Sequence, residues 1–397
     1  MNSFSFDTTQ KIVSEVGGIS QLAEICKQLQ ITRPLIVTDG GIVSCGLLIP
    51  LESIMMEANL AFNLYDKVSQ DPHESVINEG VTFALKHKCD GVIGFGGGSS
   101  MDSAKLIALL ANNAGDISTK PLKLDDIYGV DQVTDDRLPL ILIPTTAGTG
   151  SEVTPVSIIT TGETTKAGVV ATQLLPDVAL LDAQLTIGLP AHITAATGID
   201  AIVHAIEAYT SKIKKNPYSD MLAIQAIKLL SANIKIATFD GTNVKARQDM
   251  LLGACLAGQA FANAPVAAVH ALAYPLGGHF HIPHGLSNSL VLPHVMRFNA
   301  TECANLYATL AKASIDSLSD IEKSDEEVSE TFIGYIETLI MDLQLPSSLA
   351  EMEIEQSQLS LLAEEAMKQT RLLINNPRAV NQHDAMNIYQ QAFEGIK

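Results

Sequence analysis

Two patterns of apolar residues divide the chain near residue 190. In the first part, short apolar runs alternate with segments of helical spacing, at 74–88 and 100–113. Continuous apolar runs of this kind are typical of strands that are buried on both faces of a parallel sheet. The pattern therefore predicts a Rossmann-like α/β domain. Its expected strands lie at 34–39, 61–68, 91–96 and 138–145, with further short strands at 153–161 and 179–182.

The pattern changes after Pro190. Long segments rich in Ala and Leu follow with helical periodicity, first at 193–212, 219–239 and 245–264 and then onward to Phe393, and strand signals nearly vanish. We expect an α/β dinucleotide-binding domain over residues 1–190 and an all-helical metal-binding and substrate domain over 191–397. The polar tract 314–330 predicts a surface loop and the start of a helix.

Composition excludes several classes of protein. A net charge of −19 leaves no basic face for nucleic acid or for an anionic membrane surface. The five cysteines are widely spaced and never form a CxxC pair, which indicates thiols in a reducing compartment. The first residues lack a basic-then-apolar layout, so we expect no signal peptide and a cytoplasmic protein. Residues 250–296 contain no charged residue, but their histidines and prolines indicate a buried helical centre rather than a membrane span.

A glycine-rich turn follows the strand expected at 91–96. In GFGGGSSMDSAK, residues 94–105, the turn leads into a helix, where glycines allow close approach of phosphate oxygens to the backbone. The turn differs from the usual Rossmann fingerprint because Ser99 stands where the third glycine is expected. The alternative is a tight turn in which Ser99 or Ser100 only caps the helix.

Two further features support nucleotide binding. The segment PTTAGTGSEVT, residues 144–154, leaves a strand through hydroxyls and glycines that suit ribose and pyrophosphate. Asp39 ends the strand at 34–39, where a carboxylate can accept hydrogen bonds from a ribose and repel a 2′-phosphate. This favours NAD over NADP, although Asp39 also suits a simple turn.

Histidines and one carboxylate suggest a metal site. Asp200 and His204 are four residues apart and share a helical face, while four histidines cluster at 270–284 in an uncharged setting. Several buried histidines without partners would be costly, so core filling explains them poorly. One carboxylate with two or three imidazoles suits Fe²⁺ or Zn²⁺ equally well. Such a metal lowers the pKa of a bound alcohol, and a nicotinamide can then carry the electrons.

Together these segments resemble the iron-containing (group III) alcohol dehydrogenase family over nearly the whole chain. The resemblance rests on GGGSSMDSAK, PTTAGTGSEVT, TGIDAIVHAIEAYTS, HALAYPLGGHFHIPHG and, near the end, NNPRAV. It implies an NAD-dependent oxidoreductase that acts on a small alcohol or carbonyl compound, with Fe²⁺ or Zn²⁺ and as a homodimer or higher homo-oligomer. The implied metal ligands are Asp200, His204, His270 and His284. The implied cofactor contacts are Asp39, Gly97, Gly98, Ser99, Thr145, Thr146, Thr149 and Lys166.

The chain departs from the family at one position. Many members have a histidine four residues after the third metal ligand, where this chain has Tyr274. Either Tyr274 acts through its hydroxyl, or His279 or His281 supplies the missing imidazole for proton transfer.

Two other interpretations have weaker support. Glycerol dehydrogenase-like and dehydroquinate-synthase-like enzymes share the two-domain plan, but their motifs fit less closely, and a synthase needs basic residues that 250–296 lack. A non-catalytic metal- and nucleotide-binding protein would not need both sets of residues intact. The uncharged setting of the histidines favours an uncharged substrate.

Overall fold

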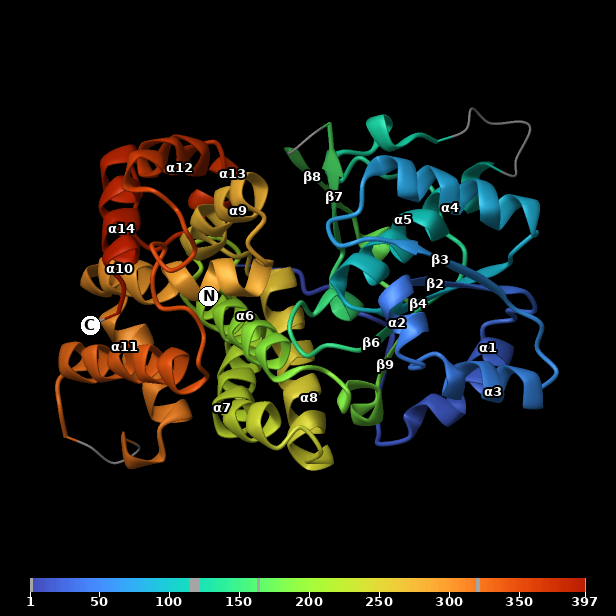
Figure 1. Ribbon diagram of the computed structural model, residues 1–397, viewed down its shortest axis with the longest axis horizontal. Coiled ribbons are helices and arrows are strands. Elements are labelled where there is room, and N and C mark those ends of the chain that lie inside the picture. Colours follow the sequence, from blue (N-terminus) through green and yellow to red (C-terminus); the bar gives the residue numbers. More distant parts are fainter. Residues whose placement is uncertain (1–2, 115–121, 163–164, 319–321, 397) are drawn as a thin grey trace. The chain divides into compact units, whose positions relative to one another are not determined.

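The chain forms two compact units (Figure 1). The computed structural model describes residues 3–114, 122–162, 165–318 and 322–396, so part of the tract 314–330 lies outside the described residues. The α/β unit comprises Asp7–Thr146 and Gly150–Gly188, and the helical unit comprises Met1–Phe6, Ala147–Thr149 and Leu189–Lys397. The units differ from the expected ranges because two short segments, Met1–Phe6 and Ala147–Thr149, group with the helices.

A six-stranded parallel sheet forms the centre of the α/β unit, which confirms the predicted fold class. Its strands follow the order β1-β9-β6-β4-β2-β3. The chain moves outward from β2 to β3, and then returns to the other side of β2 to build β4, β6 and β9. The direction of winding therefore reverses between β2 and β4. The strands are β1 (Lys11–Ser14), β2 (Pro34–Asp39), β3 (Asn63–Val68), β4 (Gly91–Gly96), β6 (Leu140–Pro144) and β9 (Val178–Leu181).

The central strands are mostly apolar because both faces of the sheet are covered. Along β2, Leu35 and Val37 face one core and Ile36 faces the other. Helices α4 and α5 cover the first face, and α1 and α3 cover the second (Figure 1). The helices of this unit are α1 (Leu22–Gln28), α2 (Gly40–Ser44), α3 (Ile49–Glu57), α4 (Glu74–Lys86) and α5 (Gly98–Ala114).

The strand expected at 153–161 lies in a second, smaller sheet. Strand β7 (Val156–Thr161) pairs antiparallel with β8 (Thr165–Val170), which pairs with the short β5 (Gly129–Val130). Alternate residues of β7 are buried, as in a strand with one covered face. Sequence analysis missed β8 and the edge strand β1, whose residues are mostly exposed and carry no apolar run.

The helical unit contains long helices, as predicted. The first three, α6, α7 and α8, pack against one another, and α10 packs on α6, α9 and α11. Proline occurs inside α9 and α10, and α10 is kinked at Cys303. The helices are α6 (Ala191–Thr210), α7 (Pro217–Phe239), α8 (Val244–Asn263), α9 (Ala268–Phe280), α10 (His284–Ser314), α11 (Asp325–Asp342), α12 (Leu359–Met367), α13 (Thr370–Leu373) and α14 (Gln382–Glu394).

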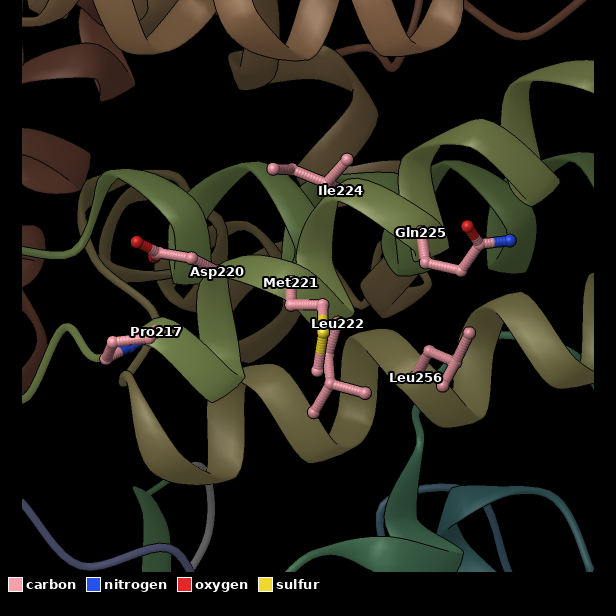
Figure 2. A pocket seen from close by; sticks show the side chains of 7 residues that line it. All are labelled: Pro217, Asp220, Met221, Leu222, Ile224, Gln225 and Leu256. Atoms are coloured by element: carbon pink, nitrogen blue, oxygen red, sulfur yellow. The ribbon is translucent and has the colours of Figure 1, made fainter.

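Helix α7 has one outward apolar face. It is the helix of the described residues that is long and apolar enough to cross a membrane, and α8 with α9, bent by 105°, passes the same test as a pair. However, α7 packs along α6 and α8, and 39% of its apolar window is buried, so this single helix is weak evidence for a membrane span. Its outer face and Leu256 of α8 form a mainly apolar groove around Met221 and Leu222 (Figure 2). Tyr218, at its start, contacts the rings of Phe4 and Phe6.

Candidate metal centre and nucleotide site

Helix α6 carries two of the four expected metal ligands. Asp200 and His204 lie one turn apart, and the helix is buried on every side from Gly198 onward. Close packing is possible because Gly198 has no side chain: a Cβ there would lie 2.7 Å from Ile234 of α7. The ligands are therefore held on a helix that cannot move without disturbing the core of the helical unit.

The other two ligands come from α9 and α10. His270 lies in the first turn of α9, and His284 is the first residue of α10. Between them, α9 ends at His281, which adopts the left-handed conformation with φ 56°. At the start of α10, a Cβ on Gly285 would collide with the carbonyl oxygen of Ala196, so glycine lets this helix approach the backbone of α6 closely. This contact brings His284 next to the α6 ligands.

One ligand atom from each of the four residues converges on a single point. These atoms all lie within 4.8 Å of one another. The Nε2 atoms of His270 and His204 are 3.1 Å apart. Asp200 Oδ1 lies 3.5 Å from His284 Nε2, 3.8 Å from His270 Nε2 and 3.9 Å from His204 Nε2.

These separations fit a four-coordinate divalent cation. Bonds of about 2.1 Å at the tetrahedral angle separate neighbouring ligand atoms by about 3.4 Å. Four of the six separations lie between 3.1 and 3.9 Å and bracket that value, and all six lie within 4.8 Å. Nitrogen and oxygen donors are also the ligand types that Zn²⁺ and Fe²⁺ accept. The residues present therefore fit the metal that the sequence implied.

Three of the four candidate ligands are buried and one is exposed. The side chains of Asp200, His204 and His270 are at most 5% exposed, whereas that of His284 is 44% exposed. A structural metal site is enclosed by its ligands, but a catalytic site keeps a position for water or substrate. Four protein ligands already complete a tetrahedron, so water or substrate would add as a fifth ligand, and the exposed side at His284 is where it could reach the metal.

Burial sets the protonation of the cluster. It lowers the pKa of His204 to about 3, although the neighbouring Asp200 acts in the opposite direction. Burial alone would raise the pKa of the Asp200 carboxyl, yet the neighbouring His204, His284 and His270 and the hydrogen bond from Asn288 hold it below its usual value. A neutral imidazole and an ionised carboxylate are the forms that bind a metal.

Two buried residues next to the cluster were not recognised from the sequence. Glu207 lies 2.7 Å from Nδ1 of His270. Asn288 donates from Nδ2 to Asp200 Oδ1 at 2.6 Å, and the same nitrogen lies 3.3 Å from Nε2 of His270 and of His284. A periodicity signal was available for both, since Glu207 follows His204 by three residues and Asn288 follows His284 by four.

The three residues considered for proton transfer lie in different settings. The Tyr274 ring is 6.4 Å from the His270 ring and 6.1 Å from the His284 ring, measured between centroids. His279 and His281 are exposed at the end of α9. The ring contact recorded for His279 is with Phe280, not with the cluster. Of the three, Tyr274 is the one beside the candidate metal ligands.

In the α/β unit, the glycine turn lies where the winding of the sheet reverses. In open α/β sheets, ligands bind outside the carboxyl ends of the strands at this point. Strand β4 ends at Gly96, whose φ of 148° is a conformation that other residues rarely adopt. Gly97 and Gly98 follow, and α5 begins at Gly98, with Ser99 in its first turn. The free N–H groups of this helix start can therefore face a phosphate group.

Two threonines and Asp39 border the same turn. Thr145 donates its backbone N–H to the carbonyl of Gly96 at 3.0 Å, and a Cβ on Gly97 would lie 3.7 Å from the hydroxyl of Thr146. Asp39 ends β2; its Oδ1 accepts the N–H of Ile42 and so caps α2. Its Oδ2 lies 3.5 Å from the Ser100 hydroxyl. Asp39 therefore caps a helix and also borders the turn.

The last two expected cofactor contacts are placed elsewhere. Lys166 lies on β8, where its Nζ is 2.5 Å from Asp71 and 3.1 Å from the hydroxyl of Thr160. Thr149 belongs to the segment Ala147–Thr149, which groups with the helical unit.

The fold and the cluster define a class of protein: an α/β unit with a nucleotide-binding topology, joined in one chain to a helical unit with a three-histidine, one-carboxylate cluster. Comparison with known proteins identifies the family. The model of the iron-containing alcohol dehydrogenase family matches residues 9–183, and the model of the C-terminal part of the Fe-containing family matches 194–393. The chain belongs to the iron-containing alcohol dehydrogenase family, and it is an oxidoreductase that acts on alcohols.

Several relatives match almost end to end. Long-chain-alcohol dehydrogenase 1 of Geobacillus thermodenitrificans is 41% identical, with 96% of this chain and 94% of the relative covered. The 1,3-propanediol dehydrogenase of Klebsiella pneumoniae is 35% identical, with 95% of each covered. Among solved structures, a 1,3-propanediol oxidoreductase superposes with a TM-score of 0.93 at 33% identity, covering 99% of this chain and all of the other.

Proposed function

We propose that this enzyme oxidises a small uncharged alcohol to the corresponding aldehyde or ketone, and catalyses the reverse reduction, with NAD and one divalent metal ion. Family membership gives the reaction class. The observation that carries the finer proposal is the cluster of three buried ligands and one exposed ligand. Such a centre can bind a metal firmly and still admit a substrate.

The proposed metal is Fe²⁺, with Zn²⁺ as the chemical alternative, held by Asp200, His204, His270 and His284. When bound, the cation supplies Lewis acidity that favours loss of the alcohol proton, and the nicotinamide supplies the hydride acceptor. Asp200 contributes a negative charge and His204 a neutral donor. The exposed edge at His284 is the proposed entry for substrate.

The proposed NAD site is the glycine turn after β4, where Gly97, Gly98 and Ser99 offer backbone N–H groups to the pyrophosphate. Asp39 has a free lone pair on its Oδ2 side for a ribose hydroxyl, and its charge opposes a 2′-phosphate. This supports NAD rather than NADP. Thr145, Thr146, Thr149 and Lys166 stay proposed contacts of the bound cofactor.

The proposed substrate is uncharged because the residues around the histidines carry no charge that would bind an anion. From 250 to 296 there is no Lys or Arg. The relatives differ in the substrate that they are named for: a long-chain alcohol, 1,3-propanediol and, in a protein of Bilophila wadsworthia 34% identical to this chain, the anion sulfoacetaldehyde. A panel of substrates therefore needs alcohols of several lengths and one anionic aldehyde, and we expect the anionic aldehyde to be the poorest.

Tyr274 is the proposed residue that shapes the substrate side of the centre. Its ring lies beside those of His270 and His284. A free phenol has a pKa near 10, too high for an efficient base at neutral pH. We therefore assign it a steric and water-ordering role. His279 and His281 are the alternative proton carriers.

A homo-oligomer in the cytoplasm is the proposed physical state. The start of α7 exposes Tyr218 and Met221, and Met221 lines the groove in Figure 2; apolar surface of this kind suits contact with a second copy. The five cysteines, all within the described residues, form no disulfide, as expected in a reducing compartment. Light scattering after size-exclusion chromatography measures the oligomeric state.

The decisive experiment is removal and return of the metal. Protein treated with a chelator should lose turnover of NAD⁺ with the alcohol panel, followed by NADH absorbance, while it still binds NADH. Anaerobic Fe²⁺, or Zn²⁺, should restore activity in proportion to bound metal. Full turnover by protein shown to be metal-free would overturn the proposal.

A further inference from the structure

Glu207 is a buried carboxylate next to the candidate metal centre. It lies on α6, three residues after His204, and its side chain is 4% exposed. Among the described residues, the ion-pair partner of this carboxylate is His270, and no Lys or Arg nitrogen is recorded within ion-pair distance. Burial of a charge in such a setting is costly unless other groups compensate for it.

Three N–H donors point at this carboxylate. Its Oε1 accepts the backbone N–H of Val269 at 2.7 Å. Its Oε2 accepts the backbone N–H of Ala267 at 3.0 Å and lies 2.7 Å from Nδ1 of His270. The same side chain therefore holds the start of α9 and one edge of the imidazole ring.

These contacts specify the tautomer of His270. A carboxylate only accepts hydrogen bonds, so Nδ1 of His270 carries the hydrogen and donates it. The lone pair is then on Nε2, which lies 3.1 Å from His204 Nε2 and 3.8 Å from Asp200 Oδ1. A glutamine at position 207 has one acceptor and one donor at its end. Whichever way it turned, its NH₂ group would face an N–H that needs an acceptor.

We propose that Glu207 is a positioning residue of the metal centre: it orients His270 through Nδ1 and provides the second negative charge that compensates a bound dication. This inference rests on the proposed metal centre. Asp200 and Glu207 together carry two negative charges, which equal the charge of Fe²⁺ or Zn²⁺ when the three imidazoles are neutral. The centre is thereby neutral in a region where residues 250–296 offer no other charge.

The competing explanation is that Glu207 only stabilises the fold. Two of its three hydrogen bonds are to backbone N–H groups at the start of α9, the contacts of a helix cap. In that case its replacement lowers the melting temperature but leaves metal affinity unchanged. The two explanations therefore differ in metal affinity, not in stability.

Asp182 offers a matched control. It is a fully buried carboxylate in the α/β unit that accepts three N–H groups, all of them from the backbone, of Gly17, Ile19 and Gln184. Asp182→Asn therefore removes a buried charge and disturbs a similar set of hydrogen bonds, but no imidazole depends on it.

The experiment is a titration of metal-free protein with Co²⁺, in competition with a chelator, followed by the visible bands of bound Co²⁺. We expect Glu207→Gln to bind Co²⁺ 10–100-fold more weakly, the effect typical of lost partners of metal-bound histidines, and with altered bands. Asp182→Asn should keep the wild-type affinity within about twofold, the usual error of such a comparison, because none of the four candidate ligands contacts Asp182. Wild-type affinity and bands in Glu207→Gln would overturn the proposal. Failure of the wild-type protein to bind Co²⁺ would instead overturn the metal centre itself.

A second measurement serves if Glu207→Gln does not fold. In wild-type protein labelled with ¹³C and ¹⁵N at histidine and loaded with Zn²⁺, the His270 imidazole, assigned through its covalent connectivity to the backbone, should carry the metal on Nε2 and a hydrogen on Nδ1. Because this hydrogen is donated to the Glu207 carboxylate, its resonance should lie downfield of the Nδ1–H resonances of His204 and His284. A metal-bound Nδ1 of His270, or an Nδ1 without hydrogen, would contradict the proposed role of Glu207.

Discussion

The candidate nucleotide site after β4 offers backbone atoms to its ligand, whereas the candidate metal site of the helical unit offers side-chain atoms. The turn offers backbone N–H groups, so its residues are small and consecutive, from Gly96 to Ser99. The cluster offers side-chain atoms from three helices. In α9 and α10, the ligating histidine lies in the first turn. A backbone site is therefore sensitive to any added Cβ, whereas a side-chain site is sensitive to loss of one donor.

The largest effect should come from removal of one metal ligand. In His270→Ala, we expect metal content and turnover to fall together, with kcat/KM reduced by at least about a thousandfold, roughly 4 kcal/mol of barrier. NADH binding should survive because the glycine turn belongs to the α/β unit. Metal analysis, NADH fluorescence and steady-state kinetics measure the three quantities.

His383→Ala is the matched control for this variant, since His383 is an exposed histidine on α14. It should keep metal and activity. Full metal content and normal turnover in His270→Ala would remove His270 from the ligand set.

The reverse pattern is expected when the turn is changed. In Gly96→Ala, the new Cβ would lie 2.7 Å from the Ser100 hydroxyl and the residue would have to keep a φ of 148°. NADH binding should weaken about tenfold or more, at least 1.4 kcal/mol, while Co²⁺ affinity stays at the wild-type value. In Gly188→Ala, where the added Cβ meets nothing within 4 Å, both affinities should stay unchanged. Equal loss of both affinities in Gly96→Ala would mean that the two sites are not separable.

Asp39 tests whether the α/β unit also selects the cofactor through a side chain. Asp39→Asn keeps an acceptor for the N–H of Ile42, so the cap of α2 survives, but it removes the charge. We expect the ratio of kcat/KM for NAD to that for NADP to fall about tenfold, roughly 1.4 kcal/mol. Asp39→Gly should lower this ratio too, but with reduced stability because the cap is lost. An unchanged ratio in both variants would exclude Asp39 from the ribose site.

Replacement of Tyr274 tests whether catalysis needs a proton carrier in the helical unit besides the proposed metal ligands. With a steric role, Tyr274→Phe should lower kcat by less than about tenfold, under roughly 1.4 kcal/mol of barrier, and the pH–rate profile should keep its shape. A loss of about a thousandfold, with the basic limb of the profile removed, would make the hydroxyl an essential proton carrier. His279→Ala and His281→Ala, assayed in the same way, test the two alternative carriers.

The smallest expected effect is on the pH dependence of stability. It concerns the buried Glu152, which lies in the segment PTTAGTGSEVT. Burial raises the pKa of its carboxyl to about 7, and its backbone N–H and Lys105 offset this only in part. Since this pKa is raised on folding, its contribution to stability is complete below the unfolded value, about 4.3, and is lost as the pH rises through about 7. Glu152→Gln should therefore lose less stability than wild type between about pH 5 and about pH 8.

Urea unfolding at the two pH values measures this difference. Glu79→Gln, at an exposed position on α4, is the control and should follow the wild-type curve. A wild-type slope in Glu152→Gln would mean that the carboxyl is already ionised in the folded protein at the lower pH.

The apolar pattern of the sequence predicts those strands and helices whose own residues favour one structure. The central strands could be predicted because both of their faces are buried and nearly every position is apolar, as in β2 from Pro34 to Val37 and in β4. The edge strand β1 could not, since its residues are mostly exposed and only pairing with β9 makes them a strand. The separate sheet of β7 and β8 depends on the same kind of pairing.

The same distinction between local sequence and tertiary contacts applies to the two candidate sites. The sequence by itself determined the glycine turn and the spacing of Asp200 and His204, because each is local to one turn or one helical face. Tertiary structure decided that His270, 66 residues after His204, would lie 3.1 Å from it, and that His284 would be the exposed ligand. It also decided that Glu207 would meet the start of α9, since the identity of a hydrogen-bond partner depends on how helices pack. Helical periodicity gives the face on which a side chain lies, but only packing of the helices decides what that face meets.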